Sequence, residues 1–282
     1  MRRMGLVICR GGGDLATGIT YRLTRAGFRV LILETGKPAA IRRQVSFCEA
    51  VYDGRAVVEG LTAVRLKTGT DGLPDREEIE QTFVRGMIPL IVDPGGRSIE
   101  ALKPDVVVDA IIAKRNLGTR IDMAPLVIGV GPGFTAGEDV HLVVETMRGH
   151  NLGRIYTEGS ALPNTGIPGL IAGVGADRVI HAQGEGHIRN ICHIGDSVEA
   201  GQEIARIYPQ EPAREDYLSV RTQISGILRG LIRDGYRVNR GFKIADVDPR
   251  PGEYRNCFTI SDKSRSIGGS VLEAVCAYYN QL

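Results

Sequence analysis

A hidden internal repeat with an offset of 40 residues is the feature that most constrains how this chain can fold. Residues 180–207 align with residues 220–247 without a gap. Identical or similar residues meet at Gln183/Gln223, Gly186/Gly226, Ile188/Leu228, Ile191/Leu231, Gly195/Gly235, Val198/Val238, Gly201/Gly241, Ile204/Ile244 and Ala205/Ala245. Turns punctuated by glycine and framed by alternating apolar residues predict short paired strands. The C-terminal half is therefore expected to hold two copies of one β unit.

Two such copies resemble the halves of a biotinyl/lipoyl-like sandwich, a barrel-sandwich hybrid, and residues 195–202 (GDSVEAGQ) are especially similar to it. That module carries its cofactor on a lysine in the hairpin between the halves. The corresponding connector here, residues 208–217 (YPQEPAREDY), contains no lysine. We therefore expect no covalent biotin or lipoate and interpret the repeat as a structural or docking module.

Composition narrows the class of protein further. A chain of 282 residues with 43% hydrophobic residues can build two domains. A formal net charge of +2 gives no electrostatic case for a nucleic-acid or membrane partner. The five cysteines form no C-x-x-C pair, which favours reduced thiols in a cytosol over a disulfide framework. With no 18-residue apolar span or signal peptide, we expect a cytoplasmic protein, with a homo-oligomer as one option.

The N-terminal half opens with a strand–helix–strand pattern around a glycine-rich turn. An apolar run ends at Cys9, the turn follows at Arg10–Gly18 (RGGGDLATG), and a second apolar run ends at Glu34. The spacing G-x-G-x-x-A with an acid about 20 residues later is typical of a dinucleotide-binding turn, in which the acid binds the ribose. The candidate cofactor-binding residues are Arg10, Gly11, Gly12, Gly13, Asp14, Thr17, Gly18 and Glu34.

The chemistry of this turn follows from its backbone. Without Cβ atoms the turn can lie against a pyrophosphate, whose charge would rest on the free amides of the helix N-terminus. Asp14 complicates this interpretation, because a carboxylate there could cap the helix and repel an anion. The alternative is a loop that binds another ligand or only packs tightly.

The rest of the N-terminal half continues the alternation of helices and strands. Asp75 is expected to cap a helix that runs to Arg85, and apolar strands are expected at residues 88–93, 105–110 and 126–129. This order predicts a Rossmann-like, doubly wound parallel sheet in an α/β fold class. Ligands of such sheets bind at the carboxyl ends of the strands, which would gather Arg10, Glu34, Asp93, Asp109 and Lys114 at one rim.

The expected domains are therefore a Rossmann-like domain at residues 1–150, a glycine- and proline-rich connector at 151–174, and a barrel-sandwich hybrid at 175–250. The final segment, 251–282, is expected to return to the N-terminal domain. His141 and His150 match no common zinc spacing, so no metal site is expected.

Several segments together carry a family resemblance. They are Arg10–Gly18 (RGGGDLATG), Ala40–Val51 (AIRRQVSFCEAV), Val127–His141 (VIGVGPGFTAGEDVH), Glu145–Arg154 (ETMRGHNLGR), Asn164–Gly169 (NTGIPG), Ala245–Arg250 (ADVDPR) and Ile260–Val271 (ISDKSRSIGGSV). In this order they resemble the YqeB family of selenium-dependent molybdenum hydroxylase accessory proteins. The resemblance implies a role in the maturation of such a hydroxylase, with the client enzyme or another maturation factor as partner.

The resemblance also implies a ligand class, a molybdopterin-type cofactor that carries phosphate. Arg42 and Arg43 could bind such an anion bidentately, or could form a solvated face. Cys48 could transfer selenium or sulfur as a thiolate, or could simply be a packed small side chain. Lys114, Asn164 and Thr165 are further candidates for ligand or partner contacts.

A second hypothesis is an NAD(H)-dependent oxidoreductase or redox sensor, with Glu34 on the ribose. The sequence offers no Ser/Thr/Tyr-plus-Lys or His-plus-Asp constellation for hydride transfer, so this hypothesis is the weaker one.

Overall fold

The computed structural model describes residues 5–69, 73–166, 169–209 and 216–281, which fall into two compact units. Unit 1 comprises residues 1–38, 46–165 and 260–282, and unit 2 comprises residues 39–45 and 166–259. The chain therefore leaves unit 1 twice, once for a short excursion and once for the repeat. No helix in the described part of the chain is long and apolar enough to cross a lipid bilayer.

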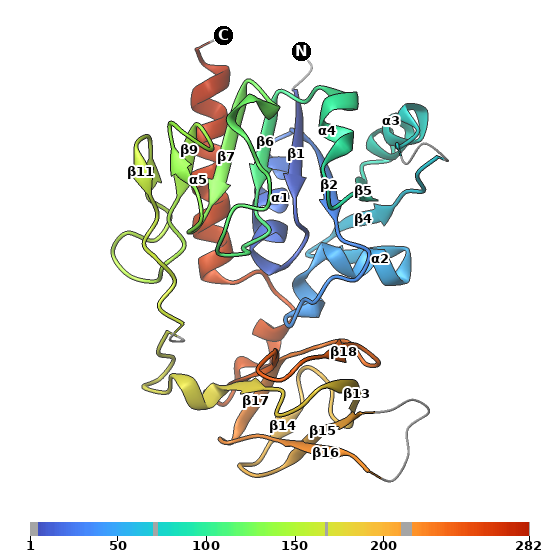
Figure 1. The fold of residues 1–282 in the computed structure, drawn as a ribbon, viewed down its shortest axis with the longest axis vertical. Coiled ribbons are helices and arrows are strands. Elements are labelled where there is room, and N and C mark those ends of the chain that lie inside the picture. The colour runs from blue at the N-terminus through green and yellow to red at the C-terminus, as the bar shows by residue number, and fades with distance from the viewer. Residues whose placement is uncertain (1–4, 70–72, 167–168, 210–215, 282) are drawn as a thin grey trace. The chain divides into compact units, whose positions relative to one another are not determined.

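A nine-stranded mixed sheet forms the centre of unit 1, in the order β10-β9-β7-β6-β1-β2-β5-β4-β3 (Figure 1). The strands are β1 (Leu6–Arg10), β2 (Arg29–Glu34), β3 (Arg55–Val58), β4 (Leu61–Arg65), β5 (Ile88–Val92), β6 (Val106–Asp109), β7 (Leu126–Val130), β9 (Leu142–Val144) and β10 (Ile155–Tyr156). The inner strands pair in parallel, whereas β3 and β10 are antiparallel to their neighbours at the two edges. A further two-stranded sheet joins β8 (Thr135–Ala136) to β11 (Gly159–Ser160).

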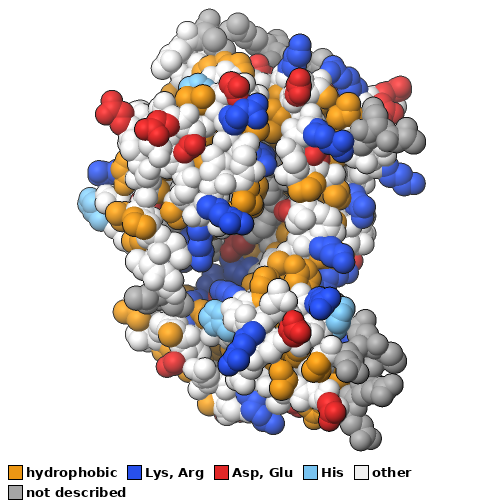
Figure 2. Space-filling view, in the orientation of Figure 1, with side chains coloured by type: hydrophobic (Ala, Val, Ile, Leu, Met, Phe, Trp, Pro, Cys, Tyr) orange, Lys and Arg blue, Asp and Glu red, His pale blue; other side chains and the backbone are white. Residues whose placement is uncertain are grey.

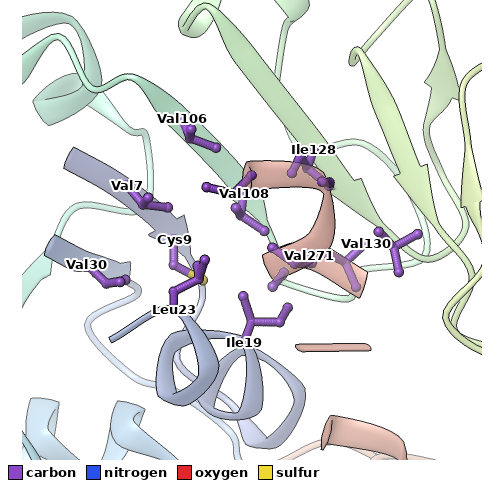
Figure 3. Packing of buried hydrophobic residues seen from close by; sticks show 14 of the residues in the cluster. Val7, Cys9, Ile19, Leu23, Val30, Val106, Val108, Ile128, Val130 and Val271 are labelled. Carbon is purple, nitrogen blue, oxygen red and sulfur yellow. The ribbon is translucent and has the colours of Figure 1, made fainter. Parts of the chain in front are cut away.

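Both faces of this sheet are buried, which explains the continuous apolar runs of its inner strands. On one face, alternate residues of β1, β2, β6 and β7 pack against α1 (Asp14–Arg25) and α5 (Asp262–Tyr279), as Figure 3 shows around Val7, Cys9, Val108 and Ile128. The other face packs against α3 (Arg76–Val84), α4 (Arg97–Leu102) and the β8 region. The helix that closes the first face therefore comes from the far end of the chain.

The predicted doubly wound Rossmann sheet is corrected by this arrangement. Between β6 and β7 the chain runs through a loop whose only described helical turn is a 3₁₀ turn at Ile121–Met123, and between β7 and β9 it forms β8 and no α-helix. The residues of these connections lack the apolar period of 3.6 that a covering helix needs. The result is a mixed sheet with antiparallel edges and a helix borrowed from the C-terminus.

Unit 2 contains the repeat and folds into two four-stranded antiparallel sheets, ordered β12-β19-β17-β14 and β16-β15-β13-β18. The first copy supplies β12 (Val179–His181), β13 (Gly186–Asn190), β14 (Ser197–Val198) and β15 (Glu203–Tyr208). The second supplies β16 (Leu218–Arg221), β17 (Gly226–Leu231), β18 (Arg237–Val238) and β19 (Lys243–Asp248). By the repeat, β12, β13, β14 and β15 correspond to β16, β17, β18 and β19. This correspondence converts one sheet order into the other, and each copy contributes strands to both sheets.

The repeated glycines have a steric reason. Gly186 and Gly226 have φ of +149° and +155°, and a Cβ there would lie 2.3 Å and 2.2 Å from the carbonyl oxygens of Tyr208 and Asp248.

The predicted barrel-sandwich hybrid is corrected to this pair of small sheets, to which the excursion 39–45 is added. Residues 210–215 of the lysine-free connector lie outside the described residues.

The excursion at residues 39–45 belongs to unit 2, where it is hydrogen-bonded to Leu231 at the end of β17. The Leu231 amide donates to the Ile41 carbonyl over 2.8 Å, and Arg43 Nε donates to the Leu231 carbonyl over 2.7 Å. Gly230 leaves room for this segment, because a Cβ there would lie 2.8 Å from Ile41 Cγ2. Unit 2 is thus completed by residues that precede the repeat by more than a hundred positions.

Candidate functional site

The glycine-rich turn at residues 10–18 joins the carboxyl end of β1 to the first turn of α1. Gly11 takes φ +98°, where a side chain would be strained and where a Cβ would lie 2.9 Å from the Ala110 carbonyl oxygen. Gly13 is the N-cap of α1 in an extended conformation, with no side-chain cap. A Cβ at Gly13 would meet no heavy atom within 4 Å. The first turn of α1 therefore presents uncapped amides beside open space.

Glu34 holds this turn from the end of β2. Its carboxylate accepts hydrogen bonds from the Gly12 amide and the Thr35 amide, each over 2.7 Å. Burial raises the pKa of Glu34, although the two amide bonds act in the opposite direction. The acid that the sequence assigns to a ribose is thus bonded to the loop itself, and an anion at Gly12 would compete with it.

Arg10 is 2% exposed and forms a buried ion pair with Asp109, with 3.4 Å between Arg10 Nη1 and Asp109 Oδ2. Thr119 bonds to both members of this pair, donating to Asp109 Oδ2 over 2.5 Å, and Arg10 Nη2 donates to the Pro94 carbonyl over 3.3 Å. Removing one member of a buried pair typically costs about 3–5 kcal/mol. Arg10 therefore ties β1 to β6 and is not presented to a ligand in this arrangement.

The predicted rim at the carboxyl edge of the sheet is assembled around this pair. Asp93 lies there too, and its carboxylate accepts from the Gly96 and Ser98 amides over 3.0 Å and 2.7 Å at the start of α4. Lys114 is exposed in the loop after β6. The rim thus brings Arg10, Glu34, Asp93 and Asp109 together, but largely as groups that fix the loops.

Asp14 does not cap its own helix. Its Oδ1 accepts a hydrogen bond from Ser264 Oγ over 2.8 Å, which joins the first turn of α1 to the first turn of α5. Gly18 lies below this contact, where a Cβ would be 2.7 Å from the Ser264 carbonyl oxygen. Ser264 is not among the predicted site residues, although the serine three positions before it, Ser261, is a recognisable helix-capping signal: its side chain accepts from the Ser264 amide.

Cys48 and Thr17 both bond to the carbonyl of Gly12 in the turn. The Cys48 amide donates to the Gly12 carbonyl over 2.8 Å, and Thr17 Oγ1 donates to the same carbonyl over 3.2 Å while accepting from the Phe47 amide over 2.9 Å. Cys48 is 1% exposed, and burial, with the charges of Glu34 and Glu49, raises the pKa of its thiol well above the ordinary value. This environment disfavours the thiolate that a transfer reaction needs.

The remaining candidates lie elsewhere. Arg42 and Arg43 belong to unit 2, where the Arg42 guanidinium donates to the carbonyls of Asn256 and Thr259 over 2.9 Å and 3.1 Å. Asn164 and Thr165 are exposed at the end of a segment of unit 1. Within unit 1 the structure therefore brings the loop candidates and Cys48 together, and it assigns Arg42 and Arg43 to unit 2.

Metal-binding groups do not gather in the described part of the chain, where no three His, Cys, Asp or Glu side chains could hold an ion together. His141 Nδ1 accepts a hydrogen bond from the Val127 amide over 3.0 Å, and burial lowers the pKa of its imidazole.

Lys and Arg side chains are interspersed with acidic and apolar ones over the face seen in Figure 2.

Fold and site define a two-unit α/β protein with a glycine-rich loop at the carboxyl edge of a mixed sheet. No known family model matches the sequence. The chain is 48% identical over 276 residues to YqeB of Escherichia coli (strain K12), a match that covers 98% of this chain and 48% of YqeB. This similarity supports the resemblance to the YqeB family that the sequence motifs indicate. The chain spans about half the length of the curated relative it matches.

Solved structures give only weak likenesses. An aspartoacylase family protein from Mesorhizobium loti is 12% identical, with 88% of this chain and 86% of that chain covered and a TM-score of 0.29. A succinylglutamate desuccinylase from Silicibacter sp. TM1040 is 13% identical, with coverages of 86% and 84% and a TM-score of 0.27. TM-scores this low do not establish a shared fold.

Proposed function

We propose that this chain is an accessory protein for the maturation of a selenium-dependent molybdenum hydroxylase, and that its glycine-rich loop binds the phosphate of a nucleotide or a molybdopterin-type ligand. The accessory role rests on the sequence resemblance alone, and the match to YqeB supports the family part of that resemblance. The ligand site is supported by one observation above the others: the uncapped first turn of α1 faces open space at Gly13.

The state of Cys48 favours binding over group transfer. A buried thiol with a raised pKa is a poor nucleophile. Glu34 is bonded to Gly12, which gives no specific support to the alternative of an NAD-dependent oxidoreductase. The loop is therefore proposed to hold a ligand for a partner enzyme.

Two experiments test this proposal. Deleting the gene from its host should abolish selenium-dependent molybdenum hydroxylase activity in cells grown with selenite, and a plasmid copy should restore it. Unchanged activity in the deletion strain would contradict the accessory role. Mass spectrometry of small molecules released from protein purified without air tests the ligand class: a pterin or nucleotide is expected, whereas a nicotinamide dinucleotide would favour the oxidoreductase.

A further inference from the structure

The outer face of one sheet of unit 2 concentrates arginines. In the sheet β16-β15-β13-β18, each strand supplies a buried residue to the core of the unit: Ile188, Ile207, Val220 and Val238. The residues that alternate with these lie on the opposite face, which we call the outer face. Within the described strands, the arginines of the outer face are Arg189 on β13, Arg206 on β15, Arg221 on β16 and Arg237 on β18.

The register of the strands brings two of these charges together. Arg189 lies directly opposite Arg206 in the antiparallel pair of β13 and β15, and like charges at such positions destabilise a sheet. Arg189 pairs with Asp234 over 3.4 Å and Arg206 with Glu203 over 3.0 Å, yet the two arginine side chains remain 48% and 36% exposed. The four described strands together contain four arginines and a single acid, Glu203, so the outer face keeps an excess of positive charge.

Tyrosine rings lie among these arginines. The Arg206 guanidinium lies over the ring of Tyr217, 4.4 Å from its centroid, and the Tyr208 ring centroid is 5.6 Å from that of Tyr217. Tyr217 is 40% exposed. Arginine and tyrosine are the residue types that surfaces for binding other proteins favour. The composition of the outer face therefore suits a protein partner.

The internal repeat supplies a matched face for comparison. In the sheet β12-β19-β17-β14, the residues that correspond to Arg189, Arg206 and Tyr208 are Arg229, Asp246 and Asp248. All three are buried. The matched face thus carries acids where the outer face carries Arg206 and Tyr208, and it is closed to solvent where the outer face is open.

The acids of the matched face are paired with arginines from outside its strands. Arg178, at the end of a 3₁₀ turn before β12, pairs with Asp246 over 2.8 Å. Arg250, just after β19, pairs with Asp248 over 2.8 Å. This chain therefore already covers one of its two sheets with protein segments of opposite charge.

We propose that the outer face of the sheet β16-β15-β13-β18 is a docking surface for an acidic segment of a partner protein, whose carboxylates bind Arg189, Arg206 and Arg237. The two sheets are then covered alike with the charges exchanged. A nucleic-acid strand is the other polyanion to consider, but Glu203 and Asp234 would repel its phosphates, and the matched face is covered by protein. This inference goes beyond the proposed function, because it assumes no ligand at the glycine-rich loop.

Fluorescence anisotropy with the full chain tests this surface. The probe is a labelled peptide of alternating Glu and Ala, and wild type should bind it more tightly than a matched peptide of Gln and Ala at low ionic strength, where exposed charges are least screened. The double variant Arg189→Gln/Arg206→Gln should weaken binding about tenfold or more, as expected for loss of charged hydrogen bonds. Arg255→Gln removes the same kind of charge from an exposed position outside these strands and should leave the affinity unchanged.

Arg237→Gln, on the edge strand β18, is a second variant that leaves the facing pair of arginines intact and should also weaken binding. Thermal unfolding checks that each variant is folded. The inference is overturned if wild type does not distinguish the two peptides, if the variants of the outer face bind like wild type, or if Arg255→Gln weakens binding equally. A single-stranded oligouridylate that binds more tightly than the Glu peptide, with the same dependence on these arginines, would assign the face to nucleic acid instead. None of these outcomes bears on the loop site.

Discussion

Glu34 shows how strongly the surroundings of a single residue decide its role. Its position after β2 is the one that a ribose-binding acid occupies, yet its carboxylate bonds to the Gly12 amide and thereby fixes the turn. Burial raises the pKa of this carboxyl, so the folded state favours its neutral form more than the unfolded state does. The charge of Glu34 is therefore a cost to stability at neutral pH.

Replacing Glu34 with Gln should test this cost. A carboxyl with a raised folded-state pKa binds protons more readily when folded, so its contribution to stability falls as the pH rises from the unfolded pKa through the folded one. Glu34→Gln can keep an acceptor for the Gly12 amide and carries no charge. The unfolding free energy of the variant, relative to wild type, should therefore improve between pH 4 and pH 7 in urea denaturation. A difference that stays constant over this range would contradict the assignment.

Gly13 is the residue on which ligand access depends. Its φ of −69° is open to any L-residue and a Cβ would find open space, so Gly13→Leu should fold normally. The new side chain would fill the space in front of the α1 amides and should lower affinity for a phosphate-bearing ligand at least about tenfold, the loss expected for a blocked charged hydrogen bond. Gly269→Leu, where a Cβ also meets no heavy atom within 4 Å, is the matched control for titration. Equal affinities of Gly13→Leu and wild type would remove the loop from the site.

At the scale of elements, the crossing of α1 and α5 holds the site together. Gly18 and Gly268 face each other, and a Cβ at Gly268 would lie 2.6 Å from the Gly18 carbonyl oxygen. Two glycines thus let the helix backbones approach closely, and this approach places Ser264 beside Asp14 at the start of α1. The N-cap predicted for α3 is confirmed, because the Asp75 side chain accepts a hydrogen bond from the Glu77 amide over 2.8 Å.

Gly18→Ala should destabilise this crossing. The added methyl group would lie 2.7 Å from Ser264 backbone and side-chain atoms, and overpacking of this kind typically costs about 1–3 kcal/mol. Gly269→Ala changes the same residue type in a helix with free space, and should stabilise by about 0.5–1 kcal/mol through helix propensity. Chemical denaturation measures both. Equal effects of the two substitutions would show that the crossing is not tight.

At the scale of the whole molecule, the two units depend on segments distant in sequence. Unit 1 is closed by residues 260–282, where Glu59 bonds to the Ile260 amide over 2.8 Å and pairs with Arg265 over 2.7 Å and 2.8 Å. Unit 2 is completed by residues 39–45 through the carbonyl contacts of Arg42. Arg42 thus has a structural role within unit 2, whatever else it binds.

Arg42→Ala should therefore loosen unit 2 and spare unit 1. The substitution removes a buried guanidinium and its two part-buried hydrogen bonds to the carbonyls of Asn256 and Thr259, and a hydrogen bond to a charged group contributes about 1.5–3 kcal/mol. Amide hydrogen exchange should accelerate in β17 and at residues 253–259, while β1 and β6 keep their protection. Gln44→Ala, at an exposed neighbouring position, is the control. Equal acceleration in both units would contradict the assignment of residues 39–45 to unit 2.

Local patterns in the sequence are enough to predict the local elements, because these depend on neighbouring residues. Apolar runs located the inner strands, Asp75 marked the start of α3, and the repeated glycines located the turns of unit 2. The groups that cover the sheet and surround the loop are known only from the folded chain. Glu34 turns back to Gly12, Arg10 is buried with Asp109, and Ser264 reaches Asp14 from the last helix. These pairings join residues 22 to 250 positions apart, and side-chain contacts at such distances are fixed by packing and charge compensation in the folded chain, which no local pattern records.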